Sequence, residues 1–179
     1  MSRIIAGEAR GRRLVAPKGL GTRPTSDKVR GAVFNLLGQF FDGGDVLDLY
    51  AGTGALALEA LSRGCARAVC VEADRGAAEV VRRNAESCGY GARVEVVRGR
   101  VEQALGRLAR GAFDLVFIDP PYADGPEAAL EAVEPLVRGG GRVVAEHDAR
   151  RLPGERYGAL RLVDRRGYGD TGVSIYVHG

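Results

Sequence analysis

The run Asp119-Pro120-Pro121-Tyr122 contains residue types that can hold a planar amine. An exocyclic amine on a nucleobase is a poor nucleophile, because its lone pair is delocalised into the ring. The Asp119 carboxylate and the Pro120 carbonyl could accept its two N–H groups and turn the lone pair towards a methyl donor. Pro121 fixes the backbone direction, and Tyr122 could stack on a base taken out of its helix. Taken alone, the run also fits a strand ended by two prolines, with the tyrosine packed in the core.

A second run with chemical potential, from residue 48 to residue 54, reads Asp-Leu-Tyr-Ala-Gly-Thr-Gly. It ends an apolar stretch and opens a helical one, where an open α/β sheet binds its ligands. Its glycines and Ala57 also match the G-x-G-x-x-A dinucleotide pattern, so an NAD-linked oxidoreductase is an alternative. A carboxylate at Asp48 would repel a pyrophosphate, but it would attract the ammonium and sulfonium groups of S-adenosylmethionine. The predicted cofactor contacts in this run are Asp48, Tyr50, Gly52, Thr53 and Gly54.

Glu72 supplies a further acid, at the end of the next apolar stretch. Its distance along the chain from the glycine loop is close to the roughly 20 residues at which an acid usually accepts the ribose hydroxyls of a bound adenosine. We predict that Glu72 and the adjacent Ala73 contact this part of the cofactor. The alternative is a tight turn between strand and helix that carries incidental acids, and the joint placement of Asp48, the two glycines and Glu72 disfavours it.

These residues lie on a regular alternation of strands and helices. Ser26 and Asp27 favour a helix start, and apolar spacing continues that helix towards Gly43 and Gly44. The pattern then predicts strands at 46–49, 68–71, 94–97, 115–118 and 142–145, and helices at 55–63, 75–87, 101–109 and 127–137. Such alternation implies right-handed crossovers and a doubly wound α/β domain with a mostly parallel, Rossmann-like sheet.

Both ends of the chain depart from this alternation. The stretches 160–164 and 173–177 resemble strands, and too few residues separate them for a crossover helix. We expect them to pair as an antiparallel hairpin at the edge of the sheet. Near the start, 3–6 and 13–16 flank a glycine-containing turn and predict a small basic hairpin.

Composition sets the broad class of protein. The 179 residues, 45% hydrophobic and 27% charged, suit one globular domain and exclude disorder. Lys and Arg exceed Asp and Glu by 26 to 23, and the basic excess gathers near the start. The cysteines and histidines lack ligand-like spacing, so we expect no metal. Without a membrane-length apolar run we expect a cytoplasmic protein. The cysteines and histidines are Cys65, Cys70, Cys88, His147 and His178.

The two runs together resemble the amino-group branch of the class I S-adenosylmethionine-dependent methyltransferases. Further segments, over nearly the whole chain, make it similar to the bacterial small-subunit rRNA guanine-N2 methyltransferase family called methyltransferase D. The segments that carry this resemblance are Arg3-Ile4-Ile5-Ala6-Gly7, the Arg-Pro-Thr run within 22–30, Phe34-Asn35, 46–54, 58–64 and Tyr168-Gly169-Asp170-Thr171.

This resemblance implies methyl transfer from S-adenosylmethionine to N2 of a guanine in 16S rRNA, in the small ribosomal subunit or an assembly intermediate, with no obligate protein partner. It places Asp119, Pro120 and Tyr122 at the target amine and base. One departure concerns the adenine end of the cofactor. Many class I enzymes carry an acid after the third strand, whereas this chain has Arg100, so we expect backbone groups around Arg100 and Val101 to recognise adenine.

The arginine-rich opening is expected to contact RNA phosphates, which would position the substrate without reading its sequence. A solvated basic face is the alternative. We divide the chain into a basic extension, 1–25, and a methyltransferase domain, 26–179. Other functions left open are DNA adenine or protein glutamine methylation and a role as an RNA-binding assembly factor. The predicted RNA contacts are Arg3, Arg10, Arg12, Arg13, Arg23 and Arg30.

Overall fold

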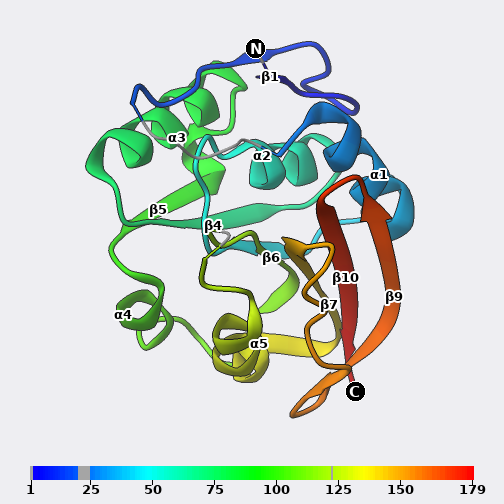
Figure 1. Cartoon of the computed structure of the whole chain (residues 1–179). Helices are drawn as coiled ribbons and strands as arrows, with labels where there is room; N and C mark the ends of the chain where they lie inside the picture. The colour runs from blue at the N-terminus through cyan, green and yellow to red at the C-terminus, as the bar shows by residue number, and fades with distance from the viewer. Residues whose placement is uncertain (1, 20–24, 122) are drawn as a thin grey trace.

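The computed structural model describes residues 2–19, 25–121 and 123–179, and its main feature is an eight-stranded sheet (Figure 1). The strand order is β5-β4-β3-β6-β7-β10-β9-β8. The strands of this sheet are β3 (Asp45–Asp48), β4 (Arg67–Glu72), β5 (Val94–Arg98), β6 (Phe113–Ile118), β7 (Val137–Asp148), β8 (Arg156–Tyr157), β9 (Leu160–Tyr168) and β10 (Thr171–His178). The α-helices are α1 (Asp27–Leu37), α2 (Ala55–Ser62), α3 (Arg75–Ser87), α4 (Val101–Leu105) and α5 (Glu127–Val133).

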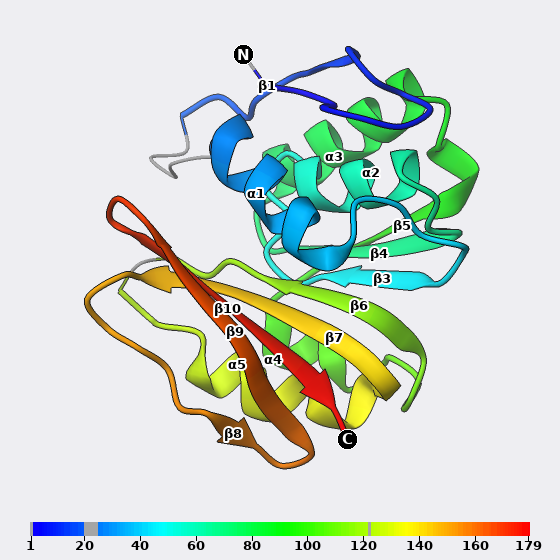
Figure 2. The same ribbon diagram turned by 90° about the vertical axis from the view of Figure 1, so that its right-hand side faces the viewer.

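Helices cover both faces of the parallel part of the sheet, as Figure 2 shows. Strands β3 to β7 pair in parallel. One hydrophobic core lies between the sheet and α1, α2 and α3, and a second lies between the sheet and α4 and α5. The strands are apolar because both of their faces are buried. The predicted doubly wound, mostly parallel fold is confirmed.

Three helices end at least four residues earlier than the apolar spacing predicts, and α2 ends one residue earlier, at Ser62. Helix α1 ends at Leu37, because Gly38 adopts a left-handed conformation (φ 101°) and its N–H bonds to the carbonyls of Asn35 and Phe34. Helix α4 ends at 105 rather than 109. Helix α5 ends at 133 and passes into a 3-10 turn containing Pro135, which has no N–H to continue an α-helix.

The C-terminal hairpin is confirmed and is longer than predicted. Strands β9 and β10 pair antiparallel through a tight turn in which Tyr168 lies opposite Thr171. Strand β10 also pairs antiparallel with β7, so it joins the hairpin to the parallel part of the sheet. The short strand β8 pairs with β9 and is the outermost strand, which sequence spacing did not predict.

The N-terminal hairpin consists of β1 (Ser2–Arg3) and β2 (Arg13–Leu14), which are shorter than predicted. Buried polar groups attach the hairpin to α2. The Glu59 carboxylate accepts the backbone N–H groups of Ile5 and Ala6 at 2.8 and 3.0 Å. At Gly7 (φ 86°) a Cβ would lie 1.9 Å from the Ser62 carbonyl oxygen, so only glycine allows this close approach.

The division at residue 25 therefore separates segments that share a core, since Ile4 and Leu14 are buried with residues of α2 and α3. It remains a prediction. Within the described residues, no helix is long and apolar enough to cross a membrane.

Candidate active site

Four acidic residues lie at the carboxyl ends of adjacent strands, where an open α/β sheet binds its ligands. Asp48 and Glu72 are the last residues of β3 and β4, Asp119 directly follows β6, and Glu146 lies two residues before the end of β7. The order β4-β3-β6-β7 brings these four residues to one edge of the sheet. The first three follow from the sequence motifs, whereas Glu146 was not among the predicted site residues.

The glycine loop after β3 is held by Glu72. One carboxylate oxygen of Glu72 accepts the N–H of Gly52 at 2.9 Å, and the other accepts the N–H of Asp74 at 3.1 Å. Gly54 caps the start of α2 in a left-handed conformation (φ 81°), and a Cβ there would contact Val81. At Gly52 a Cβ would meet nothing within 4 Å, so its backbone borders open space. This exposed backbone is suited to a ligand that lies against it.

Asp48 is a buried carboxyl with two other acids, Asp119 and Glu72, nearby. Its side chain is 1% exposed, and burial, followed by the nearby charge of Asp119, raises its pKa to about 7. Among the described residues, Asp48 Oδ1 has no hydrogen-bond partner. A buried acceptor in this state is complementary to a cationic or hydrogen-bonding ligand. The residues around the loop therefore fit the ammonium and sulfonium groups of S-adenosylmethionine.

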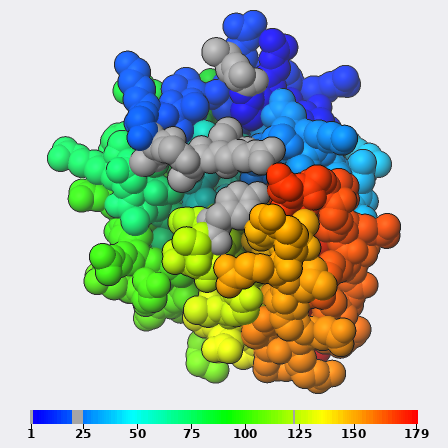
Figure 3. All heavy atoms as spheres, in the orientation of Figure 1, coloured from blue at the N-terminus to red at the C-terminus, as the bar shows by residue number. Residues whose placement is uncertain are grey.

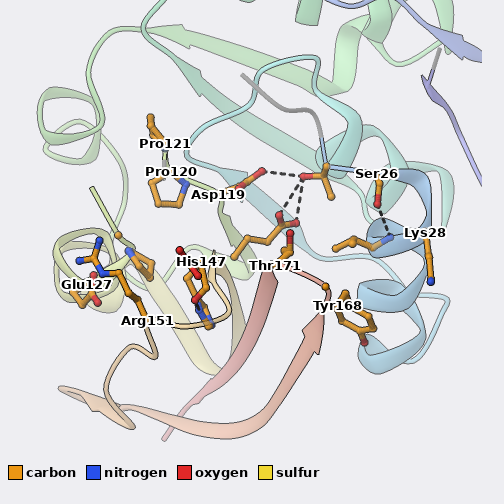
Figure 4. A pocket seen from close by; sticks show the side chains of 17 residues that line it. Ser26, Lys28, Asp119, Pro120, Pro121, Glu127, His147, Arg151, Tyr168 and Thr171 are labelled. Atoms are coloured by element: carbon orange, nitrogen blue, oxygen red, sulfur yellow. Dashed lines mark hydrogen bonds between the residues drawn. The ribbon is translucent and has the colours of Figure 1, made fainter. Parts of the chain in front are cut away.

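A cavity of about 300 Å³ opens beside Asp119 (Figure 4). Its walls include four parts of the chain: the start of α1, the end of β6, the end of β7 and the turn between β9 and β10. Its polar lining includes Thr25, Asp119 and Glu146, and its apolar lining includes Pro120 and Pro126. Its position next to the acid after β6 makes it the candidate pocket for the acceptor of the reaction.

Thr25 and Glu146 surround Asp119 with polar contacts. The Thr25 hydroxyl lies 2.9 Å from Asp119 Oδ2 and 3.3 and 3.4 Å from the two oxygens of Glu146, contacts drawn as dashed lines in Figure 4. Burial raises the pKa of both carboxyl groups, and the charge of Asp119 raises that of Glu146 further. Glu146 is 7% exposed. The sequence did contain a signal for Glu146. It directly follows the fifth predicted strand, just as Asp119 directly follows the fourth.

His147 forms part of the cavity wall. Its two ring nitrogens lie 2.8 Å from the Asp148 carbonyl oxygen and from Ser174 Oγ. A Cβ at Gly172 would lie 2.3 Å from the ring, so the strand opposite it must carry glycine. Burial lowers the pKa of His147. These contacts fix the ring in place, as expected of a structural histidine.

Asn84 on α3 connects the glycine loop to the N-terminal extension. Its Nδ2 donates to the Thr53 carbonyl at 2.8 Å and to the Val15 carbonyl at 2.9 Å, while its Oδ1 accepts the Val15 N–H at 2.9 Å. The Thr53 side chain accepts the N–H of Ala55. Asn84 was not among the predicted site residues, because its role depends on two segments that only folding brings together.

The other predicted cofactor residues lie around the same loop and the next strand end. Tyr50 is half-buried after β3, and Ala73 is exposed after β4. Arg100 is exposed and precedes α4, whose first residue, Val101, is 8% exposed. Their contact with a cofactor remains a prediction. Tyr122 lies outside the described residues. In the part of the chain that is described, no group of three or more His, Cys, Asp or Glu residues could hold a metal ion.

The predicted RNA contacts divide into three groups. Four arginines are exposed on the N-terminal extension, which covers one end of the molecule in blue in Figure 3. Arg23 lies outside the described residues. Arg30 is fully buried: it donates to Ser2 Oγ and the Arg3 carbonyl and forms an ion pair with Asp27. Without solvent exposure it cannot reach a phosphate, so its assignment to RNA is corrected to a structural role. The exposed four are Arg3, Arg10, Arg12 and Arg13.

This strand order, with an acid at the end of β3, a glycine loop after it and the sequence Asp-Pro-Pro-Tyr after β6, defines a Rossmann-like methyltransferase of class I. The family model described as Conserved hypothetical protein 95 matches residues 2–177, and the chain belongs to this family. The expected membership of the methyltransferase D family is confirmed.

Relatives of this chain are named as methyltransferases. "Putative rRNA methyltransferase YlbH" of Bacillus subtilis is 39% identical over 97% of both chains. "Ribosomal RNA small subunit methyltransferase D" of Escherichia coli K12 is 39% identical over 69% of this chain and 61% of its own length. The solved structure of "Putative methyltransferase yhhF" from Escherichia coli is 30% identical, with a TM-score of 0.81 over 99% of this chain and 97% of that one.

Proposed function

We propose that this protein transfers a methyl group from S-adenosylmethionine to the N2 amine of a guanine in 16S rRNA of the small ribosomal subunit. The observation that carries the proposal is the placement of Asp119 beside the strand that leads into the glycine loop, since β6 pairs directly with β3. A methyl donor and an amine bound at these two strand ends would be neighbours. The names of the relatives support an rRNA substrate.

The cofactor would lie against the glycine loop. Asp48 would attract its positive groups, Glu72 would accept from its ribose hydroxyls, and the open backbone at Gly52 would border it. When bound, S-adenosylmethionine supplies a methyl group on a sulfonium sulfur, which leaves as a neutral thioether when a nitrogen takes the methyl group. At the adenine end we propose the backbone around Arg100 and Val101.

Asp119 and Pro120 would prepare the amine. One N–H of the guanine N2 group would donate to the Asp119 carboxylate and the other to the Pro120 carbonyl, which directs the nitrogen lone pair at the cofactor. After the N–C bond forms, the nitrogen releases one proton, and Asp119 already holds the hydrogen bond through which it can leave. We propose Tyr122 as the residue that stacks on the extruded base.

The exposed arginines of the extension would hold the rRNA backbone. Four positive charges on one surface can bind several phosphates, and such contacts position RNA without selecting its sequence. Asn84 and Glu59 fix the extension to the elements that carry the cofactor loop. The RNA-binding surface and the transfer site would therefore keep a fixed relative position.

The reaction is tested by incubating the protein with radiolabelled S-adenosylmethionine and small subunits isolated from cells that lack this modification, followed by nucleoside analysis. We expect label in N2-methylguanosine. Label in an adenosine derivative, or in protein glutamine, would retain methyl transfer but overturn the proposed acceptor. Binding of NAD in place of S-adenosylhomocysteine would favour an oxidoreductase. Subunit binding without transfer would favour an assembly factor.

A further inference from the structure

We propose that Glu146 selects the target base, by accepting the N1–H of guanine beside the N2 amine that Asp119 holds. This inference rests on the proposed function and deepens it, because it assigns base recognition to a residue outside the Asp-Pro-Pro-Tyr run. Guanine presents N1–H and N2–H₂ side by side on its Watson–Crick edge. Two adjacent acceptors are therefore needed to read this edge.

The register of the sheet supplies the two adjacent acceptors. Ile118 at the end of β6 is paired with Ala145 of β7, so the residues that follow, Asp119 and Glu146, lie next to each other at the same edge. Both line the cavity beside the transfer site. The Thr25 hydroxyl lies within hydrogen-bonding distance of an oxygen of each carboxyl group, so the two groups converge on one point. The spacing of neighbouring strands is about 4.8 Å, the scale on which two groups of one base can be bound together.

Two buried carboxyl groups that converge on one hydroxyl repel each other when both are ionised, so this arrangement favours a proton shared between them. The Thr25 hydroxyl has one proton to donate, and its shorter distance, 2.9 Å, is to Asp119. A second proton must therefore join Asp119 and Glu146, and burial, which raises the pKa of both, keeps it there. The proton of Glu146 then points at Asp119, and its other oxygen is a pure acceptor. Among the described residues, the other titratable or charged groups around the pair are Lys28, Asp48, Glu127, His147, Asp148, Arg151 and Tyr168.

This arrangement favours guanine over adenine. With the guanine amine on Asp119, N1–H would donate to the free oxygen of Glu146. Adenine also has an amine next to N1, but its N1 is an acceptor and would face an acceptor. To bind adenine, Glu146 would have to donate its proton to N1 instead of to Asp119. The two carboxyl groups would then lie close together without a proton between them. Buried polar groups without hydrogen-bond partners cost enough binding free energy to discriminate strongly between guanine and adenine.

Two variants separate base reading from structural support. In Glu146→Gln, the amide N–H can donate to Asp119 and the amide oxygen can accept N1–H, so it reproduces the protonated acid. In Glu146→Leu both hydrogen bonds are lost at similar volume. We expect the glutamine variant to form N2-methylguanosine within about threefold of the unaltered protein, and the leucine variant to lose about 10-fold to 100-fold, the scale of lost buried hydrogen bonds.

The pH dependence distinguishes the shared proton from simple packing. In the unaltered protein, transfer should decline at high pH as the proton between Asp119 and Glu146 is lost. The glutamine variant cannot lose this proton, so its decline should be absent or displaced to higher pH. Identical profiles for the two proteins would contradict the shared proton and with it the proposed acceptor oxygen.

A binding measurement keeps this inference separate from the proposed reaction. The probes are guanosine 5′-monophosphate and 2,6-diaminopurine riboside 5′-monophosphate, titrated into the whole protein with S-adenosylhomocysteine present. Both probes carry the N2 amine, but N1 is a donor in the first and an acceptor in the second. We expect at least about 10-fold tighter binding of the guanine nucleotide. This preference should persist in Glu146→Gln and vanish in Glu146→Leu.

The outcomes are distinguishable. Equal binding of the two nucleotides, or binding of neither, overturns base reading by Glu146 even when subunits receive N2-methylguanosine. A guanine preference that needs Glu146, without methylation of subunits, supports the base pocket and rejects the proposed rRNA substrate. If the leucine variant fails to fold, the nucleotide preference of the unaltered protein and the pH profile of the glutamine variant still decide the matter.

Discussion

The carboxylate of Glu72 accepts the backbone N–H of Gly52, 20 residues earlier in the chain, at 2.9 Å. Its second oxygen accepts the N–H of Asp74. Each carboxylate oxygen can accept more than one hydrogen bond, so Glu72 can shape the glycine loop and still accept from a ribose. The acid and the loop thus act as one unit.

Replacing Glu72 by alanine should therefore weaken S-adenosylmethionine binding by about 1–3 kcal/mol, through loss of a charge-assisted contact and of loop support. Glu72→Gln, which keeps an acceptor for Gly52, should lose less. Calorimetric titration of both variants measures the difference. An affinity unchanged in the alanine variant would remove Glu72 from the cofactor site.

Asp48 should make stability depend on pH. Its pKa is about 7 in the folded protein against an ordinary value of 3.8, so folding favours its protonated form. This contribution is complete below about pH 4 and is lost as pH rises through 7. Asp48→Asn removes the titration, and at pH 8.5 it should be more stable than the unaltered protein by up to roughly 4 kcal/mol.

Chemical denaturation at pH 5 and pH 8.5 tests this sign. The stability advantage of Asp48→Asn should be larger at pH 8.5. The same variant should bind S-adenosylmethionine more weakly at that pH, because it lacks the carboxylate charge. Greater stability of the unaltered protein at pH 8.5 would mean that Asp48 is stabilised as a carboxylate by its surroundings.

Asn84 should support both stability and cofactor binding. Asn84→Ala leaves the Thr53 carbonyl and both backbone groups of Val15 without their partner, which should lower the free energy of unfolding by about 1–3 kcal/mol. Asn84→Asp keeps the acceptor for the Val15 N–H and loses the donors to the Thr53 and Val15 carbonyls, so it separates the two donated hydrogen bonds from the accepted one. Urea denaturation and cofactor titration follow the two effects. If Asn84→Ala has the stability and cofactor affinity of the unaltered protein, the hydrogen bonds of Asn84 contribute to neither.

The arginines of the extension should set the salt dependence of RNA binding. Replacing Arg10, Arg12 and Arg13 together by alanine should weaken subunit binding and reduce the slope of log affinity against log salt by up to about 3. Arg107 and Arg110 are exposed after α4, which packs on the other face of the sheet, and their replacement provides the control when losses are compared per charge removed. Equal losses in both sets would indicate a nonspecific charge effect rather than a defined RNA surface.

Sequence patterns predicted the α/β order well, because buried parallel strands are uniformly apolar and the helices between them have regular spacing. Boundaries were less accurate where local backbone chemistry overrides spacing. Gly38 ends α1 before the apolar pattern stops, and Pro135 ends the α-helical part of the fifth helix region. Strand β8 has two residues, too few for periodicity to reveal.

Site residues were predictable where a short run carries the chemistry, as for Asp48 and Asp119. Glu146 and Thr25 join Asp119 only through the register of β6 with β7 and the placement of the start of α1. Arg30 shows the opposite error. Its charge suggested an RNA contact, but its neighbours in the folded chain are Asp27, Glu59 and the backbone of the extension, so it stabilises the interior.

The most direct test of the account is the rate of N2-methylguanosine formation on unmodified small subunits by Asp119→Ala, with S-adenosylhomocysteine affinity and thermal stability measured on the same preparation. The side chain lies at the amine rather than at the glycine loop in this account. We therefore predict near-normal folding and cofactor binding with transfer reduced by at least about 100-fold, the scale of a lost positioning group. Full transfer activity in this variant would mean that the Asp119 carboxylate does not hold the amine during transfer.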